Sequence, residues 1–209
     1  MFAELNDLLD ASPQRLETGK FTLLRDTRTD GSFLVHHFLS FYLRAGCKVC
    51  FVALLQSFSH YNIIAQKLVS LTPASSDSWK GPVLLVDDLS VLLSLGATPV
   101  AVLDFIHYCR VVVCSQLKGN VVVLVHSNED SEDEENELVV NSLCHHSDLI
   151  LWVEGLATGF CKDVHGQIKI TRRVSLELTG EQDVVQIYQY KIQDKNVTFF
   201  ARGLSAAVL

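Results

Sequence analysis

The sequence predicts an α/β domain with a mostly parallel sheet flanked by helices and antiparallel hairpin strands at its C-terminal end. Over residues 1–154, short and nearly continuous apolar runs alternate with helix-like segments, which is typical of parallel strands covered on both faces. After residue 166 the apolar residues alternate with polar ones, which is typical of antiparallel strands. At 209 residues with 48% hydrophobic content, the chain suits one globular domain over 1–209.

The elements follow from these patterns in order. The expected parallel strands are residues 21–24, 48–55, 82–95, 120–126 and 149–154. The expected helices are an N-terminal one that carries Phe2, Leu5, Leu8 and Leu9, and residues 33–43, 59–69, 99–114 and 135–145. The expected antiparallel strands are residues 167–172, 184–192 and 197–201, the last two joined by a turn at 194–196. Pro99 suits the first turn of its helix, because that position needs no backbone N–H.

The net charge of −7 comes from one short stretch. Residues 129–137 (EDSEDEENE) contain seven acidic residues and no basic one, so 17 acidic residues remain against 17 basic ones elsewhere. We expect an acidic, flexible loop at about 128–137. The neutral remainder neither favours nor excludes a nucleic-acid partner.

The sequence indicates no membrane partner and a cytoplasmic or nuclear location, two compartments that it does not separate. It starts without a basic, apolar leader, and no apolar run reaches the roughly 18 residues that a membrane span requires. The six cysteines are therefore expected to be reduced. Cys47 and Cys50 have redox spacing but enter an apolar strand, so we interpret them as buried structural thiols and predict no metal site.

Residues 20–43 have the layout of a phosphate-binding strand–loop–helix unit. Compared with G-x-x-x-x-G-K-[ST], the window 26–33 reads DTRTDGSF. Asp26 replaces the first glycine, Ser32 replaces the lysine and Phe33 replaces the magnesium-binding hydroxyl. Only Gly31 fits the motif. The layout therefore predicts the fold of a nucleotide-binding protein without its phosphate chemistry.

An apolar strand ending in Asp87 and Asp88 matches the second nucleotide motif, in which an acid orders magnesium or water. A carboxylate about 4 Å from a phosphate charge costs about 4 kcal/mol at an effective dielectric constant near 20, which Arg25 and Arg28 could offset only in part. We therefore expect a degenerate site with no catalytic residue and no cofactor. The alternative is a divergent NTPase that uses Asp87 or Asp88 in a composite or non-standard nucleotide site.

The C-terminal part interleaves basic residues with aromatic ones, a pattern that could bind RNA. A strand with one solvated face gives the same pattern, and we favour this interpretation. Lys191, Lys195 and Arg202 remain the candidate tRNA contacts. A module that binds RNA alone is a third hypothesis, which predicts tight and salt-sensitive binding without partners.

Six stretches resemble one protein family closely. They are DGSFLVHHFLSFYL, CKVCFVALLQSFSHY, VLLVDDLSVLLSLG, LDFIHYCR, EGLATGFCKDVHGQ and YQYKIQDKNVTFFARG. Together they make the chain similar to the family of sixth subunits of the Elongator complex, of the mammalian type, over nearly its whole length.

The resemblance implies a RecA-like ATPase fold that lacks the ATPase motifs. It further implies a hetero-hexameric ring with the fourth and fifth Elongator subunits, which binds tRNA and supports wobble-uridine modification by a catalytic subunit elsewhere in the complex. The remaining Elongator subunits are then further partners. One departure concerns residues 71–81, where the family has a longer segment with another strand and helix, so we expect a shortened or missing segment there.

Overall fold

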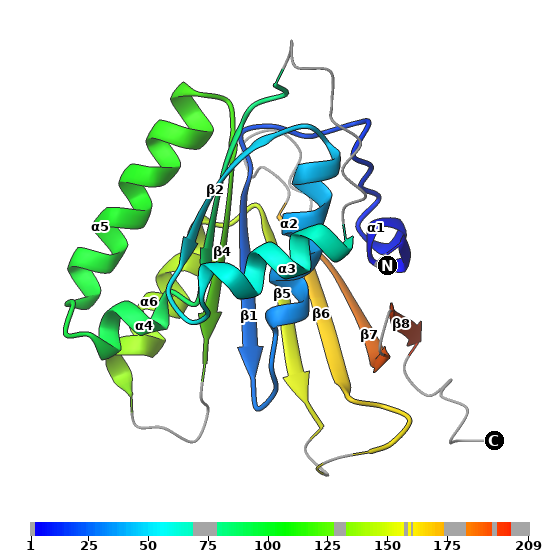
Figure 1. Ribbon diagram of the computed structural model, residues 1–209. Coiled ribbons are helices and arrows are strands. Elements are labelled where there is room, and N and C mark those ends of the chain that lie inside the picture. The colour runs from blue at the N-terminus through cyan, green and yellow to red at the C-terminus, as the bar shows by residue number, and fades with distance from the viewer. Residues whose placement is uncertain are drawn as a thin grey trace.

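An eight-stranded sheet runs through the molecule in the order β2-β3-β4-β1-β5-β6-β7-β8 (Figure 1). The computed structural model describes residues 3–68, 79–127, 133–156, 159, 161–173, 183–193 and 196–201. The strands are β1 (Phe21–Thr27), β2 (Lys48–Ala53), β3 (Pro82–Asp87), β4 (Asn120–His126), β5 (Leu149–Gly155), β6 (Gly166–Arg172), β7 (Val184–Gln193) and β8 (Asn196–Ala201).

The sheet has a parallel part and an antiparallel part, as the sequence predicts. Strands β1 to β5 pair in parallel, and β1 lies between β4 and β5. Strands β5 to β8 pair in antiparallel fashion. Each parallel strand therefore ends at the same edge of the sheet, which is the edge where ligands bind in open α/β folds.

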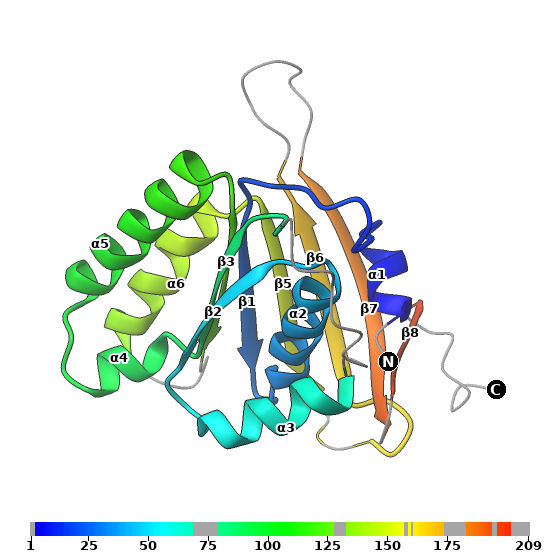
Figure 2. The same ribbon diagram turned by 45° about the horizontal axis from the view of Figure 1, so that its top comes forward.

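Helices cover the two faces of the parallel part (Figures 1 and 2). The helical elements are α1 (Ala3–Leu8), α2 (Ser32–Arg44), α3 (Phe58–Leu68), α4 (Ser90–Ser94), α5 (Pro99–Cys109), the π-helical segment η1 (Arg110–Gln116) and α6 (Glu134–His146). The first three share one hydrophobic cluster with the sheet, and the others share a second cluster on the opposite face. Among the described residues, no helix is long and apolar enough to cross a membrane.

Helix α2 is the central element of the first face, and its sequence explains why. Apolar and aromatic residues surround it almost completely, and nine of its side chains are buried. A helix that is apolar all round must be buried between other elements. On the opposite face, Thr98 caps α5 by accepting the Ala101 N–H at 3.3 Å, and Pro99 follows in the first turn as expected.

The structure corrects four predictions. Strand β2 is the edge strand with alternating exposure, so the prediction that it is buried on both faces is wrong. The apolar run 82–95 contains a strand and then α4, because the chain turns at Asp88 with φ of 47°. The expected helix 99–114 continues as a π-helix to Gln116. Cys47 is buried as expected, but Cys50 is exposed because it lies on this edge strand.

The acidic loop is shorter than the predicted 128–137. Helix α6 begins at Glu134 because the Asp133 side chain accepts the Asn136 N–H at 3.1 Å. Three glutamates of the run then lie in the first helical turn, where their negative charge interacts favourably with the positive end of the helix dipole. Residues 128–132, like residues 71–78 of the predicted shortened segment, lie outside the described part of the chain.

Candidate functional site

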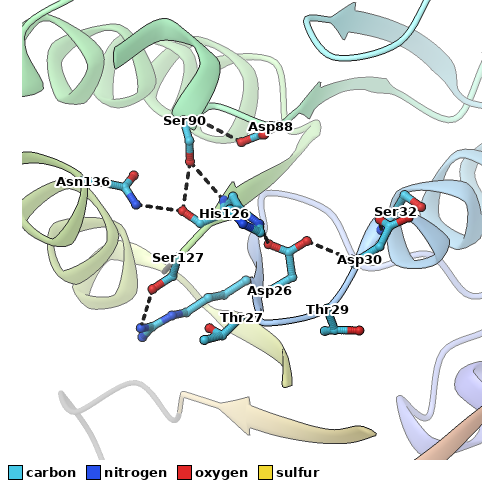
Figure 3. A network of polar contacts seen from close by, with 12 residues as sticks. Asp26, Thr27, Thr29, Asp30, Ser32, Asp88, Ser90, His126, Ser127 and Asn136 are labelled. Atoms are coloured by element: carbon cyan, nitrogen blue, oxygen red, sulfur yellow. Dashed lines mark hydrogen bonds and ion pairs between the residues drawn. The ribbon is translucent and has the colours of Figure 1, made fainter. Parts of the chain in front are cut away.

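The candidate site lies where β1, β4 and β3 end at the carboxyl edge of the sheet (Figure 3). Strand β4 separates the strand that leads into the loop from the strand that ends in Asp87. His126 at the end of β4 therefore stands between Asp26 and Asp88. The sequence predicts a degenerate nucleotide site here, and the geometry shows what the substituted residues do instead.

Asp26 is the centre of the site and is buried at 4% exposure. Its Oδ2 accepts the Gly31 N–H at 2.8 Å, and its Oδ1 lies 2.6 Å from His126 Nδ1. Burial raises the pKa of the Asp26 carboxyl, while the Gly31 N–H and His126 lower it in part. The carboxylate thus occupies the place at the start of α2 where a phosphate-binding loop presents its amides to an anion.

A second carboxylate takes the next amide of the loop. Asp30 Oδ1 accepts the Ser32 N–H at 2.8 Å. Gly31 has φ of −86°, so no left-handed backbone requires a glycine there. A Cβ on Gly31 would instead lie 2.8 Å from Asp26 Cβ and 3.2 Å from Val153 Cγ2. At the one position that fits the motif, a glycine is therefore needed for close packing against Asp26.

The positions that replace the lysine and the hydroxyl have different environments. Ser32 is half-buried, whereas Phe33 is buried at 7% exposure. The Phe33 ring lies 5.3 Å from the ring of Tyr190 on β7, which is fully buried. The Tyr190 hydroxyl in turn lies 3.2 Å from Thr29 Oγ1 in the loop. Phe33 therefore connects the loop to the antiparallel part of the sheet through the core.

Both nearby arginines contact side chains of other elements. Arg25 donates to Ser127 Oγ at 2.9 Å, and its guanidinium carbon lies 4.3 Å from the centre of the Trp152 ring. Arg28 donates to Glu154 Oε1 at 3.3 Å, on β5. In this arrangement neither guanidinium supplies the charge that a motif lysine would bring to a phosphate.

The two acids at the end of β3 have separate roles. Asp87 is buried, and its Oδ2 accepts the Tyr61 hydroxyl at 2.5 Å and the N–H groups of Leu55 and Gln56 at 3.2 and 3.4 Å. Burial and this hydrogen bond raise the pKa of Tyr61. Asp88 lies at the turn and accepts the Ser90 N–H at 3.1 Å. Through these hydrogen bonds, Asp87 holds both the segment after β2 and helix α3 against the sheet.

The sequence reasoning missed His126, Ser90 and Asn136. Ser90 Oγ accepts the His126 N–H at 3.0 Å and lies 3.1 Å from the His126 carbonyl oxygen. Asn136 Nδ2 donates to the same carbonyl at 2.8 Å. The available signal was a polar residue at the end of a buried strand that follows five apolar residues. That signal does not identify the site by itself, because the partner of His126 depends on the strand order.

The other predicted residues lie away from this site. Lys191 is on β7 and forms an ion pair with Asp163 at 2.9 Å. Lys195 and Arg202 lie outside the described residues. Within the described part of the chain, no group of three histidine, cysteine or acidic side chains is arranged to hold a metal ion.

The sheet, with its loop after β1 and its acid-ended strand β3, defines a RecA-like domain. Two solved structures share this fold. They are the uncharacterized protein PH0321 from Pyrococcus horikoshii (TM-score 0.62, 10% identity, covering 96% of this chain and 97% of that one) and the flagellar accessory protein FlaH from Methanocaldococcus jannaschii (TM-score 0.57, 9% identity, 94% and 95%).

The chain belongs to the Elongator complex protein 6 family. The family model described as Elongation complex protein 6 matches residues 2–78 and 69–194. The chain is 53% identical to Elongator complex protein 6 of Xenopus laevis over 265 aligned positions, with both chains covered completely. It is 53% identical to the Homo sapiens protein over 266 positions and 43% identical to the Danio rerio protein over 269, again with full coverage of both chains.

Proposed function

We propose that this chain is a non-catalytic, RecA-like subunit of the Elongator complex. In this proposal it forms a hetero-hexameric ring with the fourth and fifth subunits, and the assembled ring binds tRNA and supports wobble-uridine modification. The remaining Elongator subunits are further partners, and the location is cytoplasmic, with a nuclear pool as an additional proposal. Family membership supports the complex, and the geometry of the loop supports the absence of catalysis.

The single observation that carries the non-catalytic assignment is the bond from the Gly31 N–H to the Asp26 carboxylate. A phosphate at the same amide would lose that donor and meet a carboxylate at close range. At about 4 Å and an effective dielectric constant near 20, this repulsion costs about 4 kcal/mol, or roughly a thousandfold in affinity. The buried position of Asp26 keeps the carboxylate in place, because its other oxygen contacts His126.

The competing hypothesis is a divergent NTPase that uses Asp87 or Asp88. Asp87 is unsuited to a metal role here, because one oxygen already accepts three hydrogen bonds that hold the β2 end of the sheet together. Asp88 keeps a half-buried carboxylate near His126. If this hypothesis were correct, the chain or its ring would show magnesium-dependent turnover that Asp88→Ala abolishes.

Assembly is the first test. The purified chain is mixed with the fourth and fifth subunits, and the mass of the product is measured by light scattering. We expect a stable complex with six subunits that binds tRNA more tightly than this chain alone. If the chain stays a monomer in the presence of both subunits, the proposal is wrong.

Nucleotide binding is the second test, and it examines the loop independently of ring assembly. A fluorescent ATP analogue is titrated into the chain with magnesium, and Asp26→Gly is compared with the unchanged protein. We expect no saturable binding by the unchanged chain up to millimolar concentrations. Binding in the micromolar range by the unchanged chain would overturn the non-catalytic assignment, whatever the assembly test gives.

The proposed tRNA contacts, Lys191, Lys195 and Arg202, are tested only within the ring. Because Lys191 already pairs with Asp163, its contribution to a phosphate contact is expected to be modest. Each lysine that neutralises one phosphate raises the salt dependence of binding by about one unit of slope. The slope for Lys195→Ala is therefore expected to fall by about one, and an unchanged slope would remove Lys195 from the contact.

A further inference from the structure

A cavity lies at the edge of the sheet opposite the Asp26 loop. The chain between α1 and β1, here called the N-terminal strap (residues 9–20), crosses the edge where the parallel strands begin (Figures 1 and 2). Between this strap, helix α2 and the sheet is a cavity of about 300 Å³. Its volume lies at the lower end of the range that small-molecule pockets show. None of its lining residues belongs to the network around Asp26.

Side chains of the sheet hold the N-terminal strap in place over this cavity. Arg172 of β6 donates to the Leu8 carbonyl oxygen at 2.8 Å, directly before the strap. At its other end, Asn120 of β4 donates to the Glu17 carbonyl oxygen at 2.8 Å and accepts the Lys20 N–H at 2.9 Å. The cavity is therefore bounded by backbone that is fixed at both ends, as in a largely pre-formed pocket.

The inner wall of the cavity is apolar and uncharged. Its apolar part comes from the strap, from α2 and from β5, and it consists of Leu9, Leu16, Phe38, Phe41 and Leu149. Thr22 and His37 are buried polar residues of the same lining. Burial, with a smaller effect of Arg44, lowers the pKa of His37 to about 3, so the imidazole is neutral at pH 7. This wall suits the apolar part of a ligand.

Positive charge prevails among the charged residues of the lining. The four basic residues are Arg15, Lys20, Arg172 and Arg173, and the three acidic ones are Asp10, Glu17 and Asp148. Asp148 Oδ2 already accepts the Phe21 N–H at 2.8 Å. Arg15 and Lys20 are exposed, and neither side chain forms an ion pair with a described residue. These two side chains are therefore available to a negatively charged group at the opening.

We propose that this cavity binds a small organic anion with an apolar body, of which a medium-chain carboxylate is the simplest example. The apolar part lies against Phe38 and Phe41, and the carboxylate lies near Arg15, Lys20 and Arg172. An inorganic anion would leave the apolar wall in contact with water, and an organic cation would be repelled by the basic side chains. This site is separate from the degenerate nucleotide site, and the proposal does not depend on the proposed function.

The first measurement is calorimetric titration of octanoate into the full chain. We expect saturable binding of one molecule per chain. Octan-1-ol and octylamine should bind about fivefold more weakly or less, because they do not carry the negative charge. Hexanoate should bind roughly tenfold more weakly, because it buries two fewer methylene groups. Octylamine that binds as tightly as octanoate, or hexanoate that does so, would overturn the proposal.

A charge variant tests the opening of the cavity. Arg15→Gln and Lys20→Gln are combined, because both side chains are exposed and their replacement leaves the core intact. The double variant should bind octanoate about fivefold more weakly and octan-1-ol with unchanged affinity. The matched control is Lys67→Gln at the exposed end of α3, outside the cavity lining, which should change neither affinity. Equal octanoate affinity in the double variant and the control would overturn recognition by charge.

Photolabelling locates the site. An octanoate analogue with a photoreactive diazirine is illuminated with the chain, and the labelled peptides are identified by mass spectrometry. We expect label on the α2 peptide with Phe38 and Phe41, displaced by excess octanoate. Ala11→Phe places a ring in the cavity lining and should reduce this label severalfold. If that variant does not fold, the labelled peptide of the unchanged chain decides. Label on exposed Phe105 and Tyr108 of α5, without label on α2, would show non-specific adsorption and overturn the proposal.

Discussion

The loop after β1 and the edge strand β2 differ in how far their side chains are buried. In the loop, the substituted side chains face inward, where Asp26 accepts a loop amide and Phe33 packs on Tyr190. On the edge strand β2 the Cys50 side chain is exposed, and on α5 Phe105 and Tyr108 are exposed. The residues that depart from the phosphate-loop motif thus take part in the core, while the edge strand leaves a side chain exposed. Measurements of the free energy of unfolding at both places test this difference.

The largest effect is expected at Phe33. Phe33→Thr restores the motif hydroxyl but removes a ring that packs against Tyr190 and buries a hydroxyl in its place. We expect a loss of about 4 kcal/mol in the free energy of unfolding, measured with urea. Ser32→Lys, which restores the neighbouring motif lysine at a half-buried position, is the control and should cost less than about 1 kcal/mol. Similar costs for both variants would show that the loop is not integrated into the core.

The next largest effect on stability is expected at Asp87, and it distinguishes Asp87 from Asp88. Asp87→Ala leaves the Tyr61 hydroxyl and the N–H groups of Leu55 and Gln56 without their acceptor in a buried site. We expect a loss of about 3 kcal/mol. Asp88→Ala removes one bond to Ser90 and should cost about 1 kcal/mol. If Asp88→Ala were the more destabilising variant, the anchoring role assigned to Asp87 would be wrong.

A pH-dependent effect is expected from the interior of α2. His37 is 2% exposed, and burial, with a smaller effect of Arg44, lowers its pKa to about 3. Between pH 6.5 and 3 the unfolded chain binds a proton at this residue and the folded chain does not, so stability falls as the pH falls. The loss attributable to His37 is about 2 kcal/mol at pH 5 relative to pH 7.5.

The measurement is urea unfolding at both pH values. His37→Phe should flatten the pH dependence by this amount, while His145→Gln at the exposed end of α6 should leave it unchanged. The pKa of His36 is also lowered by burial, so part of the slope remains in both variants. An unchanged slope in His37→Phe would mean that His37 is protonated in the folded chain.

The order of strands and helices was predictable, because apolar runs and helix periodicity are local properties of the chain. The departure of Asp26, Ser32 and Phe33 from the phosphate-loop motif could be read directly from the sequence for the same reason. The strand order, in contrast, depends on pairing between segments that are far apart in the sequence. It places β4 between β1 and β3 and so brings His126 against Asp26, a contact that local patterns do not predict.

The exposure of β2 could not be predicted from sequence patterns either. Its residues, KVCFVA, read as a strand buried on both faces, but β2 is the edge strand of the sheet. Burial depends on neighbours, which are set by the whole connection between β2 and β3. The start of α6 inside the acidic run was predicted to within one residue, but its cap at Asp133 was not.

The smallest effect is expected on the exposed side of α5. Tyr108→Ser removes a large aromatic side chain, but the ring is 68% exposed and little apolar surface is lost from the core. We expect a change within about 0.5 kcal/mol in urea unfolding, against about 4 kcal/mol for Phe33→Thr. A loss of more than about 1 kcal/mol would show that the Tyr108 ring is covered in solution, contrary to its exposure here.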